Sequence, residues 1–268
     1  MVTLATLTCI PMFLGAGWLC DRFGRKPILL IGFLLTAVTL FPIFRAMTQY
    51  ANPALASAQS SAPIVIDADP AECSFMFNPV GARHFTSSCD IAKQALSAAG
   101  VSYEIRSGAT GETTAVHIGN SSVQSYDAKD LDKAHAGARA VAFNTSLGSA
   151  LDAARYPRKA DPASFNKPMV FVLPVVLLVY MALTLVPTAP ALVELFPTQI
   201  RHTSMSFPYH FASGWIGGLL PTFSFALSAQ KGDIYFGLWY PMAWIIGSFV
   251  VALLFLKERR NVDLAADF

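Results

Sequence analysis

Five runs of apolar residues occur along the chain, and one long polar stretch separates the second run from the third. Each run is about as long as a helix needs to cross the hydrocarbon core of a bilayer, roughly 20 residues. We expect them to be transmembrane helices, because lipid offers no partner for unpaired backbone N–H and C=O groups. They cover residues 1–20, 28–46, 168–193, 203–228 and 234–256.

The first run lies where a secretory signal would also lie. It has no basic residues ahead of its apolar core, and Asp21 and Arg22 follow it instead of a cleavage site made of small residues. We therefore interpret residues 1–20 as a membrane span.

The polar stretch at 47–166 predicts a separate α+β module, so the expected segments are 1–46, 47–166 and 167–268. It carries 20 of the 36 charged residues of the chain. About 120 residues suffice for a core of their own. Alternating β-branched positions predict strands, and helical spacing predicts helices. The expected strands are 62–68, 101–106 and 114–119, and the expected helices are 89–100 and 128–156.

Two of the four cysteines lie in this module, 16 residues apart, at Cys73 and Cys89. In an oxidising exoplasmic compartment we expect them to form a structural disulfide. The alternative is a reactive cysteine assisted by His84 and Asp90. No nucleophile signature surrounds either cysteine, which favours the disulfide.

Composition and charge then give the setting. Only 13% of the residues are charged and 54% are hydrophobic, which is typical of a membrane protein, and the net charge of +2 does not suggest nucleic acid. The loops 21–27, 194–202 and 257–268 hold seven Lys and Arg residues, whereas the loop near 229–233 holds one. The positive-inside rule places the three basic loops in the cytoplasm. We expect a multi-pass protein of the plasma (inner) membrane with residues 47–166 on the exoplasmic side.

The sequence "GWLCDRFGRKP" at 17–27 concentrates charge between two apolar runs. Gly24 suits a tight bend. Asp21 would face the positive N-terminal end of the next helix and pair with Arg25. Such a contact locks two helices in one conformation and breaks in another. The simpler alternative is an ordinary basic turn that anchors the helices.

This stretch resembles the signature loop of the major facilitator superfamily, G-x-L-A-D-R-x-G-R-K, except that Cys20 replaces the small residue. The matching positions are Gly17, Asp21, Arg22, Gly24, Arg25 and Lys26. A second stretch, 192–223, is similar to the loop between helices ten and eleven of the metabolite:proton symporters, E-L-F-P-T-x-x-R-x-T/S. Its matches are Glu194, Leu195, Phe196, Pro197, Thr198, Arg201 and Thr203.

The resemblance implies a mainly α, polytopic membrane fold, in which the five spans are helices eight to twelve of twelve. The chain would then be the C-terminal portion of a secondary active transporter, and the N-terminal half would be its missing partner. Proton-coupled symport of a small organic acid or a zwitterionic metabolite by alternating access is the implied activity. The contacts of the gate would come from Asp21 and Arg25 with Glu194 and Arg201. The insertion at 47–166 departs from the compact family pattern.

Two further features have both a functional and a simpler interpretation. His210 is the ionisable residue of the fourth run, and with Tyr209 it is a candidate for substrate or proton contact. Its alternative is a position near the cytoplasmic interface. Pro187 and Pro190 would break or bend the third run, as a gating helix or as a passive kink.

The rival hypothesis is a membrane-anchored module that binds a ligand or a partner on the exoplasmic side, with the helices as its anchor. The size of the insertion motivates it. We expect no enzyme, no metal and no cofactor, because the sequence shows no metal cluster, catalytic triad or phosphate-binding loop. The expected partners are a small-molecule substrate, protons and the lipid bilayer.

Overall fold

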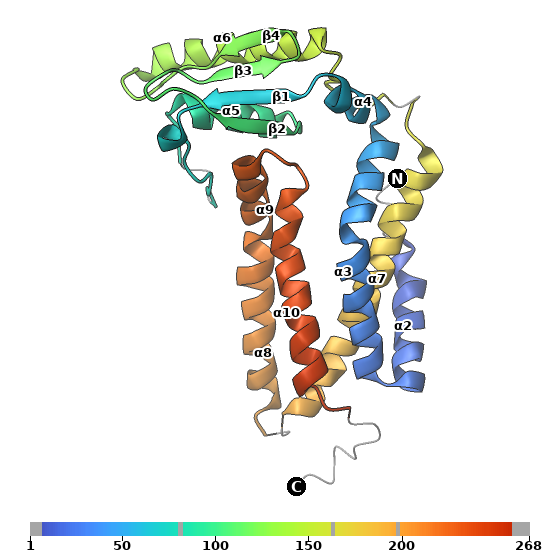
Figure 1. Ribbon diagram of the computed structural model, residues 1–268. Coiled ribbons are helices and arrows are strands. Elements are labelled where there is room, and N and C mark those ends of the chain that lie inside the picture. The colour runs from blue at the N-terminus through green and yellow to red at the C-terminus, as the bar shows by residue number, and fades with distance from the viewer. Residues whose placement is uncertain (1–6, 80–82, 162–163, 197–198, 259–268) are drawn as a thin grey trace. The chain divides into compact units, whose positions relative to one another are not determined.

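Helices form most of the chain, and a four-stranded sheet lies in its middle part (Figure 1). The computed structural model describes residues 7–79, 83–161, 164–196 and 199–258. They divide into two units. The first unit takes its residues from 1–47, 166–220 and 239–268, and the second from 48–165 and 221–238.

The first unit is built from apolar helices. They are α2 (Cys9–Phe23), α3 (Arg25–Ala51, whose last residues enter the second unit), α7 (Lys167–Leu195), α8 (Arg201–Phe211), the π-helical η2 (Ala212–Gly217), the start of α9 (Gly218–Lys231) and α10 (Trp239–Phe255). Three segments are long and apolar enough to cross a membrane: α3, α7 and Phe236–Phe255. The protein is therefore associated with a membrane.

These three segments correspond to the expected spans at 28–46, 168–193 and 234–256, which are confirmed as helices of spanning length. The other two expected spans stay predictions. Residues 1–6 lie outside the described residues, so the first run is described as α2 alone. The fourth run is helical but divides into α8, η2 and α9. Prolines at 208 and 221 lack the N–H that a regular helix needs, and η2 lies between them.

Close approach of backbones holds the helices of the first unit together. A Cβ on Gly32 of α3 would lie only 2.8 Å from Cγ2 of Thr184 in α7, so glycine permits this contact. The rings of Phe41 in α3 and Trp239 at the start of α10 lie 5.2 Å apart. Small residues and aromatic contacts therefore set the packing.

The second unit contains one mixed sheet with strand order β2-β1-β3-β4. Strand β1 pairs in parallel with β2 and antiparallel with β3, and β3 pairs antiparallel with β4. The strands are β1 (Ile64–Ala68), β2 (Tyr103–Ser107), β3 (Ala115–Ile118) and β4 (Ser121–Gln124). The helices of this unit are α4 (Pro53–Ser61), η1 (Pro70–Glu72), α5 (Ser88–Ala98), α6 (Lys133–Ala153), the remainder of α9 and η3 (Phe236–Leu238).

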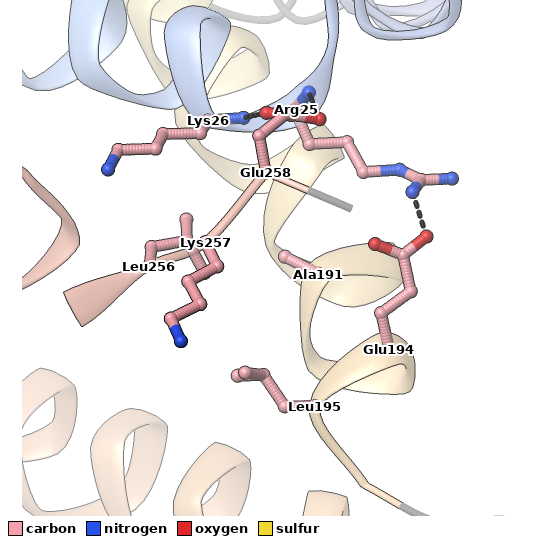
Figure 2. A pocket seen from close by; sticks show the side chains of 8 residues that line it. All are labelled: Arg25, Lys26, Ala191, Glu194, Leu195, Leu256, Lys257 and Glu258. Atoms are coloured by element: carbon pink, nitrogen blue, oxygen red, sulfur yellow. Dashed lines mark hydrogen bonds and ion pairs between the residues drawn. The ribbon is translucent and has the colours of Figure 1, made fainter. Parts of the chain in front are cut away.

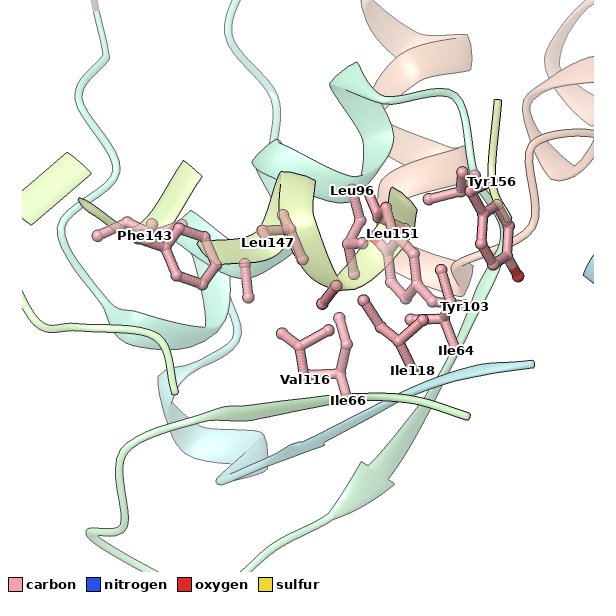
Figure 3. Packing of buried hydrophobic residues seen from close by; sticks show 14 of the residues in the cluster. Ile64, Ile66, Leu96, Tyr103, Val116, Ile118, Phe143, Leu147, Leu151 and Tyr156 are labelled. Atoms are coloured by element: carbon pink, nitrogen blue, oxygen red, sulfur yellow. The ribbon is translucent and has the colours of Figure 1, made fainter. Parts of the chain in front are cut away.

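The core of the second unit lies between one face of the sheet and helices α5 and α6 (Figure 3). Ile64 and Ile66 of β1 and Val116 of β3 point into it, and Leu96 and Leu147 cover them from the two helices. The intervening strand residues, such as Val65 and Asp67, are half-exposed on the other face. The alternation of apolar and polar residues along the strands therefore reflects a sheet that is covered by helices on one face.

The strands expected at 62–68, 101–106 and 114–119 and the helix expected at 89–100 are confirmed, with small shifts of their ends. The last helix begins later than residue 128, because Asp132 accepts a hydrogen bond from the backbone N–H of His135 and caps α6. Strand β4 was not predicted, since its residues are polar and mostly exposed at the edge of the sheet.

Candidate functional site

The candidate site is an ionic cluster in the first unit, where the start of α3 meets the end of α7 and the residues after α10 (Figure 2). A single residue, Gly24, separates α2 from α3. Its φ of +95° is a conformation that favours glycine, and its N–H donates to the carbonyl of Cys20 at 2.9 Å. A Cβ there would lie 2.8 Å from Oε1 of Glu258. Gly24 therefore supplies the bend and leaves room for that carboxylate.

Arg25 and Glu194 form the central ion pair. The guanidinium of Arg25 donates through Nη1 to Oε1 of Glu194. The two residues are 169 positions apart, and each lies at the end of an apolar helix. The pair joins the N-terminal end of α3 to the C-terminal end of α7.

Glu258 caps the beginning of α3. Its carboxylate accepts hydrogen bonds from the backbone N–H groups of Arg25 at 3.2 Å and Lys26 at 2.8 Å. A carboxylate is stabilised there, because the first N–H groups of a helix have no partner within the helix. The ammonium of Lys26 donates to the carbonyl of Leu253 in α10 at 2.9 Å. Helices α3, α7 and α10 are thus joined by charged groups.

The sequence predicted Arg25 and Glu194 as gate residues but assigned Asp21 as the partner of Arg25. The structure pairs Arg25 with Glu194, and within the described part of the chain Asp21 is exposed and has no ion pair. Glu258 was missed, because an acidic residue in a charged tail gives no signal of its own. Asp21 precedes Arg25 by four residues, yet Gly24 ends the helix between them, so the i, i+4 contact of a continuous helix does not form.

The other signature residues that the structure describes do not line the cluster. The guanidinium of Arg22 lies 5.6 Å from the ring centre of Trp18. Nε of Arg201 donates to the carbonyl of Phe196, directly after α7, at 3.2 Å, and so satisfies a carbonyl at the helix end. Gly17 is half-buried in α2, with no atom within 4 Å of where a Cβ would lie. The expected loop residues Pro197 and Thr198 lie outside the described residues, as do Arg259 and Arg260.

Tyr209 and His210 lie on α8, both exposed, with their rings 5.7 Å apart and nearly perpendicular. In the described residues no ion pair involves His210. A cavity of about 730 Å³ in the first unit is lined by α3, α7, α8 and α10, and its lining includes no ionisable side chain. The cavity is therefore suited to apolar groups rather than to pairing with a carboxylate.

Helix α7 continues past Pro187 and Pro190, so these prolines do not break it, and the expected bend stays a prediction. Each proline removes one backbone hydrogen bond of the helix. The hydroxyl of Thr188 donates to the carbonyl of Thr184 at 2.6 Å, an additional hydrogen bond within this stretch. The helix is therefore continuous but has fewer backbone hydrogen bonds between Leu183 and Pro190.

In the second unit, Cys73 and Cys89 form a disulfide with their Cα atoms 5.2 Å apart. It ties the residue after η1 to the first turn of α5. Next to it, Ser74 donates through its N–H and its hydroxyl to the carboxylate of Asp90, at 2.9 Å and 2.5 Å. The disulfide therefore has a structural position, because it links two elements of the second unit. Asp90 accepts hydrogen bonds from Ser74 and does not contact a free thiol.

No group of three or more His, Cys, Asp and Glu residues suited to a metal ion occurs in the parts of the chain that the structure describes. Comparisons with protein-family models, with curated proteins and with solved structures gave no match to this chain.

Proposed function

We propose that the chain is the C-terminal portion of a secondary active transporter of the major facilitator type, most similar to the metabolite:proton symporters. It would contribute five spans, with residues 47–166 on the exoplasmic side of the plasma membrane. The substrate class is a small organic acid or a zwitterionic metabolite, moved together with protons. The missing N-terminal half would supply the other side of the substrate site.

One observation carries this proposal: the ionic cluster that joins the ends of three apolar helices. An anchor helix needs only basic residues near the membrane surface, which interact with lipid headgroups. Here Arg25 instead contacts a carboxylate on another helix, and Glu258 occupies the helix end that Asp21 was expected to face. Charged groups that join several helices at one end form a contact that can break and re-form.

Alternating access gives this contact a role. In such transporters the two repeats move against each other around a central site, and one side opens while the other closes. The Arg25–Glu194 pair would hold the helix ends in one state. Asp21, exposed near the end of α2 and four residues before Arg25, would receive Arg25 in another state. The gate therefore needs both carboxylates, although only one is paired in the structure.

The test is uptake in cells that express the chain together with its upstream coding sequence. We would measure uptake of radiolabelled succinate and glycine betaine with and without a proton gradient. Asp21→Ala and Glu194→Gln should each abolish uptake while the protein remains in the membrane. The matched control is Glu104→Gln, which removes one charge of the exposed Glu104–Arg106 pair in the second unit. Full uptake by Asp21→Ala would refute the gate.

A membrane-anchored module that binds a ligand is the second candidate, because the second unit has its own core and disulfide. The two candidates separate in the full chain. Ligand binding that persists in Glu194→Gln, in a protein that never transports, favours the anchored module. Loss of uptake in Glu194→Gln favours the transporter.

A further inference from the structure

The turn between α9 and α10 is held by the inserted α+β residues of the second unit. The last carbonyl groups of a helix lack partners within the helix. Here the buried hydroxyl of Tyr103 donates to the carbonyl of Ala229 at 2.6 Å, and the N–H of Tyr103 donates to the carbonyl of Gly232 at 2.7 Å. Tyr103 begins strand β2, more than 120 residues before the turn. One residue of the sheet therefore satisfies two carbonyls of the turn.

Gly232 is required by this contact in two ways. Its φ of +72° lies in the left-handed region that glycine tolerates best. A Cβ on Gly232 would lie 2.0 Å from the carbonyl oxygen of Tyr103, which is too close for any side chain. Two residues further on, the N–H of Ile234 donates to the hydroxyl of Ser102 at 3.4 Å. Both sides of the contact are thus held by hydrogen bonds that involve backbone groups.

Lys93 adds a charged contact. Its side chain, on α5, is 0% exposed. The ammonium donates to the carbonyl of Ser74 at 2.8 Å and to the side-chain carbonyl of Gln230 on α9 at 3.0 Å, with the carboxylate of Asp90 at 3.7 Å. Burial lowers the pKa of Lys93, and Asp90 opposes that shift. A buried ammonium is costly unless it is paired, so Gln230 is one of the partners that make its burial possible.

The packing beside these hydrogen bonds is incomplete. A cavity of about 310 Å³ lies between the two parts of the contact, and it is lined by residues of both, among them Val101, Phe225 and Ile234. The apolar side chains that line this open pocket lack part of the contact that a closed core provides. A contact held by specific hydrogen bonds, with incomplete apolar packing beside them, is suited to opening and closing.

We propose that the inserted residues act as a clamp on the turn between α9 and α10, and that Lys93, Tyr103 and Gly232 form the contact. This proposal rests on the transporter function proposed above. A transporter of that type moves the ends of its helices in each cycle. Helix α9 ends at this turn and α10 begins after it. The clamp restrains that end of the two helices, and its release accompanies opening on the same side.

Hydrogen–deuterium exchange of the full chain in lipid nanodiscs tests the contact directly. Tyr103→Phe keeps the ring and removes the hydroxyl, and it should speed exchange of residues 226–238 by about tenfold. Tyr156→Phe is the matched control, because the Tyr156 hydroxyl also donates to a backbone carbonyl at 2.8 Å, but that carbonyl belongs to Ala62 and not to the turn. It should leave exchange of 226–238 unchanged.

Gly232→Ala is the second variant, and it should speed exchange of the same residues while β1 and β3 keep their protection. Unchanged exchange of 226–238 in Tyr103→Phe, or equal acceleration by Tyr156→Phe, would overturn the clamp. Uptake is a separate readout. If Tyr103→Phe speeds exchange and alters uptake where Tyr156→Phe does not, the clamp acts in transport. A third outcome is faster exchange of 226–238 in Tyr103→Phe without uptake by any variant or by the unchanged protein. The contact is then supported, but its role in transport and the proposed function are both refuted.

Discussion

Arg25 and Glu194 lie in surroundings between those of a surface ion pair and those of a core ion pair. Their side chains are 31% and 14% exposed. An exposed pair contributes little, because water and salt screen it, whereas breaking a buried pair leaves an uncompensated charge. The Arg25–Glu194 pair should therefore contribute measurably to stability without being indispensable.

Glu194→Gln should lower the free energy of unfolding of the full chain in detergent by about 1–2 kcal/mol, since Arg25 keeps its charge and loses its carboxylate. The measurement is denaturant unfolding followed by tryptophan fluorescence. The control is Glu104→Gln, whose pair with Arg106 is 70% and 61% exposed and should change stability by less than about 0.5 kcal/mol. Equal effects of the two substitutions would contradict this ranking.

The raised pKa of Tyr103 predicts that the stability of the fold depends on pH in the alkaline range. Burial raises its pKa to about 12 from an ordinary value near 10, and the nearby hydroxyl of Ser97 opposes this only in part. The folded protein therefore holds the phenolic proton more tightly than the unfolded chain. Its contribution is fully present below pH 10 and should be lost between pH 10 and pH 12, by about 2–3 kcal/mol.

The measurement is denaturant unfolding of the full chain across this range, with the protection of β1 and β3 from hydrogen exchange as the readout. Burial also raises the pKa of Tyr126 and Tyr156, so the unchanged protein is compared with Tyr103→Phe. The difference between the two should shrink as the pH rises from 10 to 12. A constant difference would mean that Tyr103 is not held in its protonated form by the fold.

Among single residues, those with a special backbone or a charge at a helix end were predictable. Gly24 was expected from the tight bend between two apolar runs, and Arg25 and Glu194 were expected from the two loop motifs that resemble those of the major facilitator superfamily. Glu258, Lys93 and Tyr103 were not predictable as site residues, because each acquires its role from a partner more than 120 residues away. Nothing in the local sequence distinguishes them from ordinary surface or core residues.

At the scale of elements, the start of α3 depends on a residue outside that helix. Gly24, the residue before α3, has no side chain that could cap the helix, and the carboxylate of Glu258 serves instead. The carboxylate also opposes the positive end of the helix dipole. The beginning of one helix and the segment after another are therefore coupled.

Glu258→Ala should lower the unfolding free energy by about 1 kcal/mol and increase hydrogen exchange of the first turn of α3, because two N–H groups lose their acceptor. Glu112→Ala is the control, since Glu112 is exposed in the loop between β2 and β3. Exchange that rises equally in both variants would show that Glu258 is not a cap.

Most elements were predictable: α3 and α7 from the length of their apolar runs, and α5 and β1 from their apolar periodicity. The failures have local causes. Strand β4 lacks an apolar face because it lies at the edge of the sheet, and the start of α6 is set by the Asp132 cap. The fourth apolar run was predicted as one helix, because prolines and a change of helix type do not lower its hydrophobicity. In the structure η2 divides it.

At the scale of the whole molecule, the proposed topology has a direct test. With Cys9 and Cys20 replaced by serine, Ser122→Cys on the exposed edge strand should react with a membrane-impermeant maleimide in intact cells, whereas Gln199→Cys should react only after lysis. Both positions are exposed, so access to solvent does not separate them. Labelling of Gln199→Cys in intact cells would reverse the proposed orientation.

The sequence alone determined that long apolar segments associate with a membrane and that a charged, strand-containing module interrupts them. Hydrophobicity and periodicity are local properties, and the energetic demand of lipid on the backbone acts on each segment separately. Only the tertiary structure decided which partner each charged group finds: Glu194 for Arg25, the backbone at the start of α3 for Glu258, and the side chain of Gln230 for Lys93. Those choices depend on distances between residues far apart in the chain, and Coulombic and hydrogen-bond energies fall off too steeply with distance for sequence order to reveal them.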